Sequence, residues 1–304
     1  MHYRGGSASA SASASASASA SASASASASA SASASASADE VVAEARALGV
    51  EAVALRADLT DEDACRRLVR EAAEWGRGLR LRHGVGPAGG AGLTALVNNA
   101  GVQPTQALPG MTLADWKAVV DTNLSSVFAC TQAAAEVMST GGGGRESAGG
   151  VGGGGRVSAG GVGGGGRVSA GGVGGGGRVS AGGAGGGGSV THIASIEATH
   201  PAPLHAHYSA AKAAVVMHAR SAALEYGPHG IRVNTVSPGL IDREGLAEAW
   251  PEGVRRWQQA VPTGRLGRPE DVGDACVFLA SPLASWVTGH DLVVDGGVSA
   301  RPTW

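Results

Sequence analysis

A tyrosine and a lysine four residues apart are the most informative pair of side chains in the sequence. Tyr208 and Lys212 occur in the stretch HYSAAKAAV, which is typical of a helix, and residues four apart lie on one helix face. A phenol with an ordinary pKa of about 10 is a poor acid–base catalyst at neutral pH, but a neighbouring ammonium favours the phenolate and lowers that pKa. The pair therefore predicts proton transfer by Tyr208. The spacing alone is weak evidence, because tyrosine and lysine often meet this way by chance.

Two further polar residues complete a proton-transfer set. Ser195 ends a predicted strand, and in a parallel α/β sheet ligands bind at the carboxyl ends of the strands. Asn123 lies in the stretch DTNLSSVF, on the helix predicted before that strand. A hydroxyl that holds a carbonyl oxygen, a tyrosine that exchanges its proton and a lysine that tunes the tyrosine fit the interconversion of an alcohol and a carbonyl. The hydride must come from a cofactor, because no side chain supplies one.

Helices and strands alternate around these residues, which predicts an α/β fold with a mainly parallel sheet. Strands are expected over 51–58, 93–101, 189–195, 231–239 and 291–297. Helices are expected over 39–48, 60–75, 114–138, 207–226 and 269–280, and a long turn-rich loop over 76–92. Thr60 is the expected N-cap of its helix, since Asp63 three residues later comes close to a capping box.

Two low-complexity segments interrupt this pattern. Residues 7–38 alternate serine with alanine, and residues 141–188 repeat a glycine-rich unit of eleven residues four times. The glycine block has no apolar face, so a flexible linker is expected there, with RNA binding through its four arginines as the alternative. We expect a disordered tract over 1–38, the first part of one domain over 39–140, a flexible insert over 141–188, and the second part, with the catalytic residues, over 189–304.

Composition restricts the class of protein. The net charge of −2 gives no general attraction to nucleic acid or to acidic membranes. The three cysteines, Cys65, Cys130 and Cys276, have no CxxC or metal-ligand spacing and are expected to be reduced thiols in the core. The start of the chain leads into the serine–alanine tract rather than a leucine-rich signal core, and we expect a cytoplasmic protein.

The rare residues of this chain coincide with a set of motifs. Only four asparagines and two lysines occur, against twenty-one arginines; Asn98, Asn99, Asn123 and one lysine fall within the motifs, and Asn234 lies in the strand just before one of them. Through them the chain resembles the short-chain dehydrogenase/reductase family from Asp39 to about Ser299. The motifs are Asp58, Asn98-Asn99-Ala100-Gly101, Asn123, Ser195, Tyr208 with Lys212, Pro238-Gly239 and the ending GRLGRPEDVGDACVFLASPLASWVTGHDLVVDGG.

The resemblance implies a Rossmann-like, doubly wound sheet in a single domain, with the strand order 3-2-1-4-5-6-7. It implies an enzyme that interconverts a secondary alcohol and a carbonyl compound with NAD or NADP, for instance a 3-oxoacyl reductase. The implied partners are a small-molecule substrate and further copies of the chain in a homo-oligomer, with no nucleic acid and no membrane.

The resemblance also implies a role for each motif residue. Tyr208 is the general acid/base, Lys212 lowers its pKa and binds the nicotinamide ribose, Ser195 binds the substrate oxygen, and Asn123 supports a proton relay. Asp58 lies near the adenine, Asn98, Ala100 and Gly101 lie beside the cofactor, and Pro238 and Gly239 lie along the nicotinamide.

Several residues leave alternatives open. Asn98 could serve only to hydrogen-bond the end of its strand, and Arg243 stands where the family often carries a threonine that faces the nicotinamide amide. Four histidines, at positions 192, 200, 205 and 207, surround the site; we expect solvated loop residues, with substrate contacts and metal binding as alternatives. Ser209 and Lys212 fit the S-x-x-K signature of a serine hydrolase, but its S-D-N and K-T-G partners do not occur.

The serine–alanine tract occupies the place of an important family segment. In the family, the residues before the 39–48 helix form the first strand, a glycine-rich turn that cradles the pyrophosphate, a helix, and the second strand that selects NAD or NADP. No such glycine motif precedes Asp39, so we expect the first two strands to be missing or malformed and the cofactor to bind weakly. Two other functions are alternatives: a non-catalytic binding protein that has lost cofactor binding, and a silk-like protein that self-associates through its repeats. A further alternative is that both repeats are mistranslated or expanded DNA in a GC-rich gene and that the native protein has an ordinary N-terminus.

Overall fold

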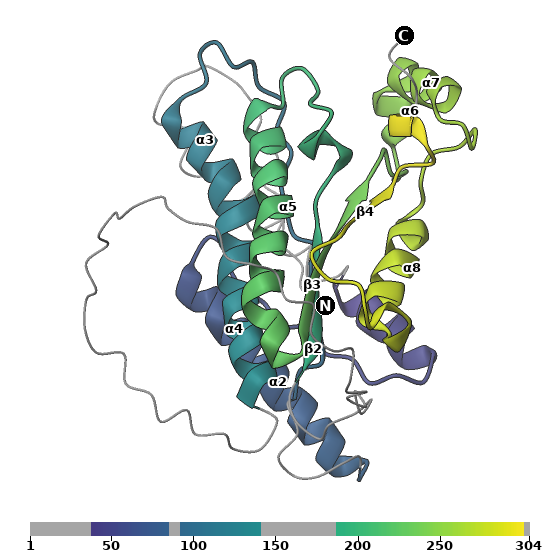
Figure 1. Cartoon of the computed structure of the whole chain (residues 1–304). Coiled ribbons are helices and arrows are strands. Elements are labelled where there is room, and N and C mark those ends of the chain that lie inside the picture. The colour runs from purple at the N-terminus through teal and green to yellow at the C-terminus, as the bar shows by residue number, and fades with distance from the viewer. Residues whose placement is uncertain (1–37, 85–91, 141–186, 301–304) are drawn as a thin grey trace, which may run out of the picture.

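The computed structural model describes residues 38–84, 92–140 and 187–300. The expectations for the tract 1–38 and for the insert 141–188 concern residues that lie almost wholly outside these ranges. The described residues fold into a parallel sheet with helices on both faces (Figure 1).

Four strands form the sheet in the order of the sequence. They are β1 (Ala95–Asn98), β2 (Gly188–Ile193), β3 (Ile231–Pro238) and β4 (Asp291–Val294), and each neighbouring pair is parallel. This order agrees with strands four to seven of the implied order. The registers, such as Asn98 opposite His192, bring the carboxyl ends of the first three strands to one edge. That edge is where the chemistry-bearing residues of the sequence gather.

Helices cover the two faces of the sheet. Helix α4 (Ser126–Thr140) and helix α5 (Ala206–Tyr226) lie on one face, and α8 (Pro269–Ala280) lies on the other (Figure 1). Helix α2 (Glu62–Arg82) packs on α4 from outside. Because β2 and β3 have helices on both sides, most of their residues are buried, including polar ones such as Thr191 and Asn234.

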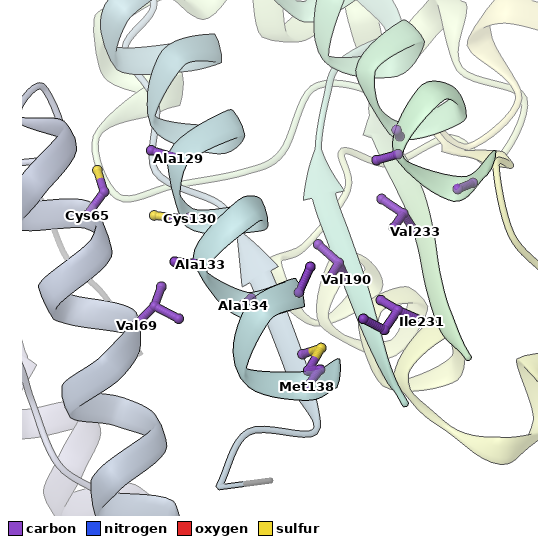
Figure 2. Packing of buried hydrophobic residues seen from close by; sticks show 14 of the residues in the cluster. Cys65, Val69, Ala129, Cys130, Ala133, Ala134, Met138, Val190, Ile231 and Val233 are labelled. Carbon is purple, nitrogen blue, oxygen red and sulfur yellow. The ribbon is translucent and has the colours of Figure 1, made fainter. Parts of the chain in front are cut away.

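The main core lies between the sheet and the helices α2, α4 and α5. Figure 2 shows Cys65 and Val69 of α2 facing α4, and Met138 of α4 beside Val190 of β2. All three cysteines are free thiols, and Cys65 and Cys130 are buried in this cluster, as the sequence predicts.

The remaining elements shape the carboxyl-terminal part. Helices α6 (Leu246–Ala249) and α7 (Pro251–Ala260) connect β3 to α8, and short 3₁₀ turns occur at Gly227–His229, Pro282–Ala284 and Val298–Ala300. A helix over 38–47 agrees with the predicted 39–48 helix.

Three local predictions are wrong. Residues 51–58 form no strand, because a strand needs a hydrogen-bonded neighbour and none of the described strands lies beside them. The N-cap of α2 is Asp61 rather than Thr60, because the Asp61 side chain accepts the Asp63 amide, and the helix continues to Arg82 through part of the predicted loop. The predicted 114–138 helix is divided into α3 (Leu113–Val120), a π-helical turn (Asp121–Ser125) and α4.

Candidate active site

Ser195 and Tyr208 come together beyond the carboxyl end of β2. Ser195 is the N-cap of the 3₁₀ turn Ile196–Ala198, and its hydroxyl oxygen accepts the amide of Glu197 at 3.1 Å. Tyr208 lies in the first turn of α5, and its side chain is close enough to Ser195 for that residue to lower the pKa of the phenol. The two hydroxyls that the sequence selects are therefore direct neighbours.

Lys212 follows one turn later on α5. Its side chain is 4% exposed, and Nζ donates to the carbonyl of Ile193 at 2.6 Å. The ammonium also lies 5.6 Å from the centre of the Tyr208 ring, as the four-residue spacing predicts. Burial lowers the pKa of Lys212 to about 8, since the charged form loses hydration.

The pKa of Tyr208 differs from the sequence prediction. We expected Lys212 to lower it, but it is raised above its ordinary value of 10, chiefly because burial disfavours the phenolate. The hydrogen bond with Ser195 lowers this pKa, and the charge of Glu197 raises it further. The Lys212 ammonium lies over the ring and donates to the β2 backbone, so it is not directed at the phenolic oxygen.

Asn123 lies in the π-helical turn and holds the loop that follows β1. Its side chain is fully buried; Oδ1 accepts the Val102 amide and Nδ2 donates to the Val102 carbonyl, both at 2.8 Å. A Cβ added to Gly101 would lie 3.2 Å from Asn123 Oδ1 and 3.6 Å from Lys212 Nζ. The structure thus brings Asn123, Gly101 and Lys212 into one group.

The other predicted cofactor residues lie at the ends of strands. Asn98 Nδ2 donates to Thr131 and to His192 Nδ1. These bonds at the end of the strand correspond to the alternative, purely structural role of Asn98. Ala100 packs against the main core. Pro238 is the last residue of β3, and the Gly239 amide after it donates to the Val294 carbonyl.

Asp58 lies in the segment that precedes α2. It is exposed, and its carboxylate accepts hydrogen bonds from the amide and the hydroxyl of Thr60 at 2.9 and 2.7 Å.

The segment 242–262, which contains α6 and α7, includes two tryptophans. A Cβ on Gly239 would lie 3.2 Å from the Trp257 ring, whereas Trp250 is half exposed and Arg243 is exposed.

The expectation of solvated histidines is wrong for two of the four. His192 and His207 are fully buried, because His192 lies in a strand covered on both faces and His207 points into the protein from α5. His205 is partly buried and His200 is exposed. Across the described residues, no three His, Cys, Asp or Glu side chains are placed to hold a metal ion.

Sequence reasoning missed a cluster of polar residues beside Tyr208. Glu197 accepts hydrogen bonds from Gln103, His205 and Ser209. The signal was available, since Gln103 and Glu197 follow the carboxyl ends of neighbouring parallel strands. Ser209 donates to Glu197 while Lys212 donates to Ile193, so the two residues of the S-x-x-K match bind different partners.

Within the described part of the chain, no helix combines the length and the apolar character that crossing a bilayer requires.

Two family models match the chain. The model described as short chain dehydrogenase matches residues 10–146, and the one described as enoyl-(acyl carrier protein) reductase matches residues 178–299. A cis-4-hydroxycyclohexanecarboxylate dehydrogenase of Sinomonas cyclohexanicum is 33% identical over 86% of this chain and 82% of its own length. A 3-oxoacyl-[acyl-carrier-protein] reductase of Synechocystis sp. is 29% identical over 86% of this chain and 81% of its own length.

Solved structures are similar over the same extent. A 7α-hydroxysteroid dehydrogenase in complex with NADH and 7-oxo glycochenodeoxycholic acid matches with a TM-score of 0.63 and 28% identity, over 86% of this chain and 79% of that one. A short-chain type dehydrogenase/reductase from Mycobacterium marinum matches with a TM-score of 0.60 and 28% identity, over 86% and 81%.

Proposed function

Because this chain belongs to the short-chain dehydrogenase/reductase family, we propose that it interconverts a secondary alcohol and a carbonyl compound with NAD or NADP. The observation that carries the proposal is the pair of neighbouring side chains, Ser195 and Tyr208, beside the buried ammonium of Lys212. The alternative is a related protein that binds a partner without catalysis.

Each residue of this group has one task in the proposed reaction. Ser195 donates a hydrogen bond to the substrate oxygen and fixes its position. Tyr208 gives its proton to that oxygen when a carbonyl is reduced, and takes the proton back when an alcohol is oxidised. The nicotinamide, when bound, supplies or accepts the hydride at the same carbon.

The raised pKa of Tyr208 favours one direction at neutral pH. A phenol whose pKa lies above 10 is almost fully protonated at neutral pH, so it is ready to donate a proton. Alcohol oxidation requires the phenolate, and its rate should rise with pH toward the pKa of Tyr208. Carbonyl reduction should fall only when the pH passes that pKa.

The residues around the group fit the nicotinamide end of a cofactor. At Gly101 and Gly239 the backbone packs closely on Asn123 and Trp257, because an added Cβ would lie 3.2 Å from each of these side chains. Lys212 would bind the ribose, Asn123 would support a proton relay, and Asn98, Ala100 and Pro238 would line the same edge. Asp58 would lie near the adenine, where the side chain is exposed.

The substrate class stays broad. The named relatives act on a ring alcohol and on a 3-oxoacyl thioester, and one structural neighbour holds a steroid. Trp250 and Trp257 in the segment after β3 favour a ligand with an apolar part.

A cytoplasmic homo-oligomer is also part of the proposal. Family membership supports it, and so do exposed apolar side chains between α8 and β4, such as Trp286 and Leu283.

The test is Tyr208→Phe in the full chain, assayed with secondary alcohols and ketones at millimolar NAD and NADP. Turnover should fall by about a hundredfold to ten-thousandfold while cofactor affinity is kept, because only the acid/base is lost. Tyr226→Phe, at the other end of α5, is the matched control and should keep its turnover.

Undiminished turnover in Tyr208→Phe would refute the assignment. If the full chain is inactive with every substrate class, it is either an enzyme without an effective cofactor segment or a non-catalytic binding protein. A variant with an ordinary glycine-rich cofactor segment grafted before Asp39 separates these two cases. Activity of that graft supports the enzyme, and an inactive graft that still binds NAD(P) supports the non-catalytic alternative.

A further inference from the structure

Glu197 is a largely buried carboxylate beside the proposed catalytic pair. It lies in the 3₁₀ turn two residues after Ser195, and its side chain is 14% exposed. Its amide donates to the Ser195 hydroxyl oxygen, so the backbone of Glu197 already fixes one member of the pair. A carboxylate in such a position has lost much of its hydration and requires hydrogen-bond donors from the protein.

Three side chains from two segments, the loop after β1 and the start of α5, converge on this carboxylate. Gln103 Nε2 donates to Oε1 at 2.7 Å from the loop after β1, and the Ser209 hydroxyl donates to Oε2 at 3.1 Å from α5. His205 Nδ1 lies 3.1 and 3.2 Å from the two oxygens, just before α5 begins. Both carboxylate oxygens are thereby used, and the His205 ring nitrogen lies within hydrogen-bond distance of both.

The backbone supports the same convergence. Leu204 has a φ of 69°, in the left-handed region that leucine rarely adopts, and its carbonyl accepts the Gln106 amide at 2.8 Å. This turn directs the chain into α5 with His205 toward Glu197. A strained residue next to a site is retained when the surrounding contacts fix it.

From these contacts we propose that Glu197 is a positioning residue, which ties the loop after β1, the turn after β2 and the start of α5 together so that Ser195 and Tyr208 keep their mutual geometry. The inference rests on the proposed function of that pair. None of the motifs in the sequence includes Glu197, Gln103 or His205, so this would be a device of this chain beyond the motif residues.

Glu197 also acts on Tyr208 through its charge. A negative charge close to a phenol disfavours the phenolate, and Glu197 raises the pKa of Tyr208 in this way. The other polar groups that face Tyr208 are the Ser195 hydroxyl from the turn after β2, the His205 ring, which lies edge-on at 6.2 Å, and the Lys212 ammonium on α5. Removal of the negative charge should therefore move the Tyr208 titration to lower pH.

The test is Glu197→Gln in the full chain, because glutamine keeps the shape but carries no charge and only one acceptor oxygen. The expected result is a fall in kcat of about ten- to a hundredfold with an unchanged KM for the cofactor, since a small misplacement of reacting groups has that effect. The pH profile of alcohol oxidation should shift to lower pH. The phenolate titration, measured by ultraviolet absorbance against Tyr208→Phe, should shift in the same direction without any need for turnover.

Two further variants make the result specific. Glu71→Gln removes an exposed carboxylate on α2 and should change neither kcat nor the titration. Glu197→Asp keeps the charge but shortens the side chain, so kcat should fall while the Tyr208 titration stays near that of the parent chain. This variant also tests the positioning role if Glu197→Gln does not fold.

A Glu197→Gln variant with the parent kcat and the parent Tyr208 titration would overturn the positioning role. That outcome leaves the proposed function intact, provided that Tyr208→Phe is inactive. Conversely, an active Tyr208→Phe would refute the proposed function whatever Glu197→Gln does.

Discussion

Burial sets the protonation of single residues in this site more than pairing does. It raises the pKa of Tyr208, lowers that of Lys212 to about 8 and lowers that of His192 to about 3. The directions differ because burial disfavours the charged form, which is the deprotonated form of a phenol and the protonated form of an amine or imidazole. The neutral phenol is the form required to reduce a carbonyl.

His192 should make the stability of the protein depend on pH. Its pKa of about 3 in the folded state lies below its ordinary value of 6.5, chiefly through burial and then through His218 and Lys212. The unfolded chain therefore binds a proton that the folded chain does not, and stability present above pH 6.5 is lost as the pH falls toward 3. One such proton changes the free energy of unfolding by about 1.4 kcal/mol per pH unit.

The measurement is urea unfolding between neutral pH and pH 4.5 for His192→Asn, whose Oδ1 can take the place of the Nδ1 that accepts from Asn98. The free energy of unfolding of this variant should fall less steeply with acid than that of the parent. His229→Asn, at an exposed position, is the control and should follow the parent curve. Parallel curves for His192→Asn and the parent would contradict the assignment.

At the scale of elements, the site depends on an irregular turn inside a long helix. The π-helical turn Asp121–Ser125 places Asn123 toward the loop after β1, where its amide makes both backbone hydrogen bonds of Val102. One extra residue in a helical turn rotates the side chains that follow, and such turns are frequent at functional sites. The helix therefore positions the loop that carries Gly101 and Gln103.

Asn123→Leu tests this coupling with a side chain of nearly the same shape. The Val102 amide and carbonyl would lose their partners, which should lower the free energy of unfolding by about 1–3 kcal/mol and reduce turnover as the loop loosens. Chemical denaturation and kcat measured on the same preparation give the result. Gln258→Leu, on the exposed side of α7, should change neither quantity, and an Asn123→Leu variant with parent stability would show that water replaces the bonds.

The elements differ in how far the sequence predicts them. Strands β2 and β3 are found close to their expected bounds, where β-branched residues alternate along short segments. The π-helical turn at Asn123 could not be predicted, because it depends on the tertiary contact with Val102. Residues 51–58 have a strand-like sequence but no partner among the described strands, and pairing is a property of the sheet rather than of the segment.

The same distinction applies to the site. Tyr208, Lys212, Ser195 and Asn123 could be identified from spacing and motifs, and the structure brings them together. The position of Glu197 after a strand could have been noticed, but its hydrogen bonds and the direction of the Tyr208 pKa depend on burial and on contacts between segments, which spacing does not encode. The buried state of His192 likewise follows from helices packed on both faces of β2.

At the scale of the whole molecule, the described sheet holds the catalytic half of a dinucleotide-binding fold. Strands β1 to β4 agree with strands four to seven of the family order, and the proposed catalytic group lies at their carboxyl edge. The segment that cradles the pyrophosphate in the family coincides with the serine–alanine tract, residues 7–38. We therefore expect different parts of the chain to determine catalytic geometry and cofactor affinity.

The full chain should bind NAD(P) at least about a hundredfold more weakly than a variant with an ordinary glycine-rich segment grafted before Asp39. In such a segment the pyrophosphate accepts hydrogen bonds from backbone amides at a turn without Cβ atoms and lies at the positive end of a helix. Loss of two or three charge-assisted hydrogen bonds, at roughly 1.5–3 kcal/mol each, exceeds the 2.8 kcal/mol or so that a hundredfold change represents.

Calorimetric titration with NADH and NADPH measures this difference. The matched control is the same graft with valine at its turn glycines, which restores the apolar strands but excludes the phosphates, and it should bind about as weakly as the full chain. Serine hydroxyls in the tract could donate to phosphate, but ordering that backbone costs about 1–2 kcal/mol per residue, so they should not compensate. Residual binding through Lys212 and the edge at Gly101 should be weaker than micromolar. A micromolar dissociation constant for either cofactor with the unmodified chain would show that residues 7–38 do serve as a phosphate site.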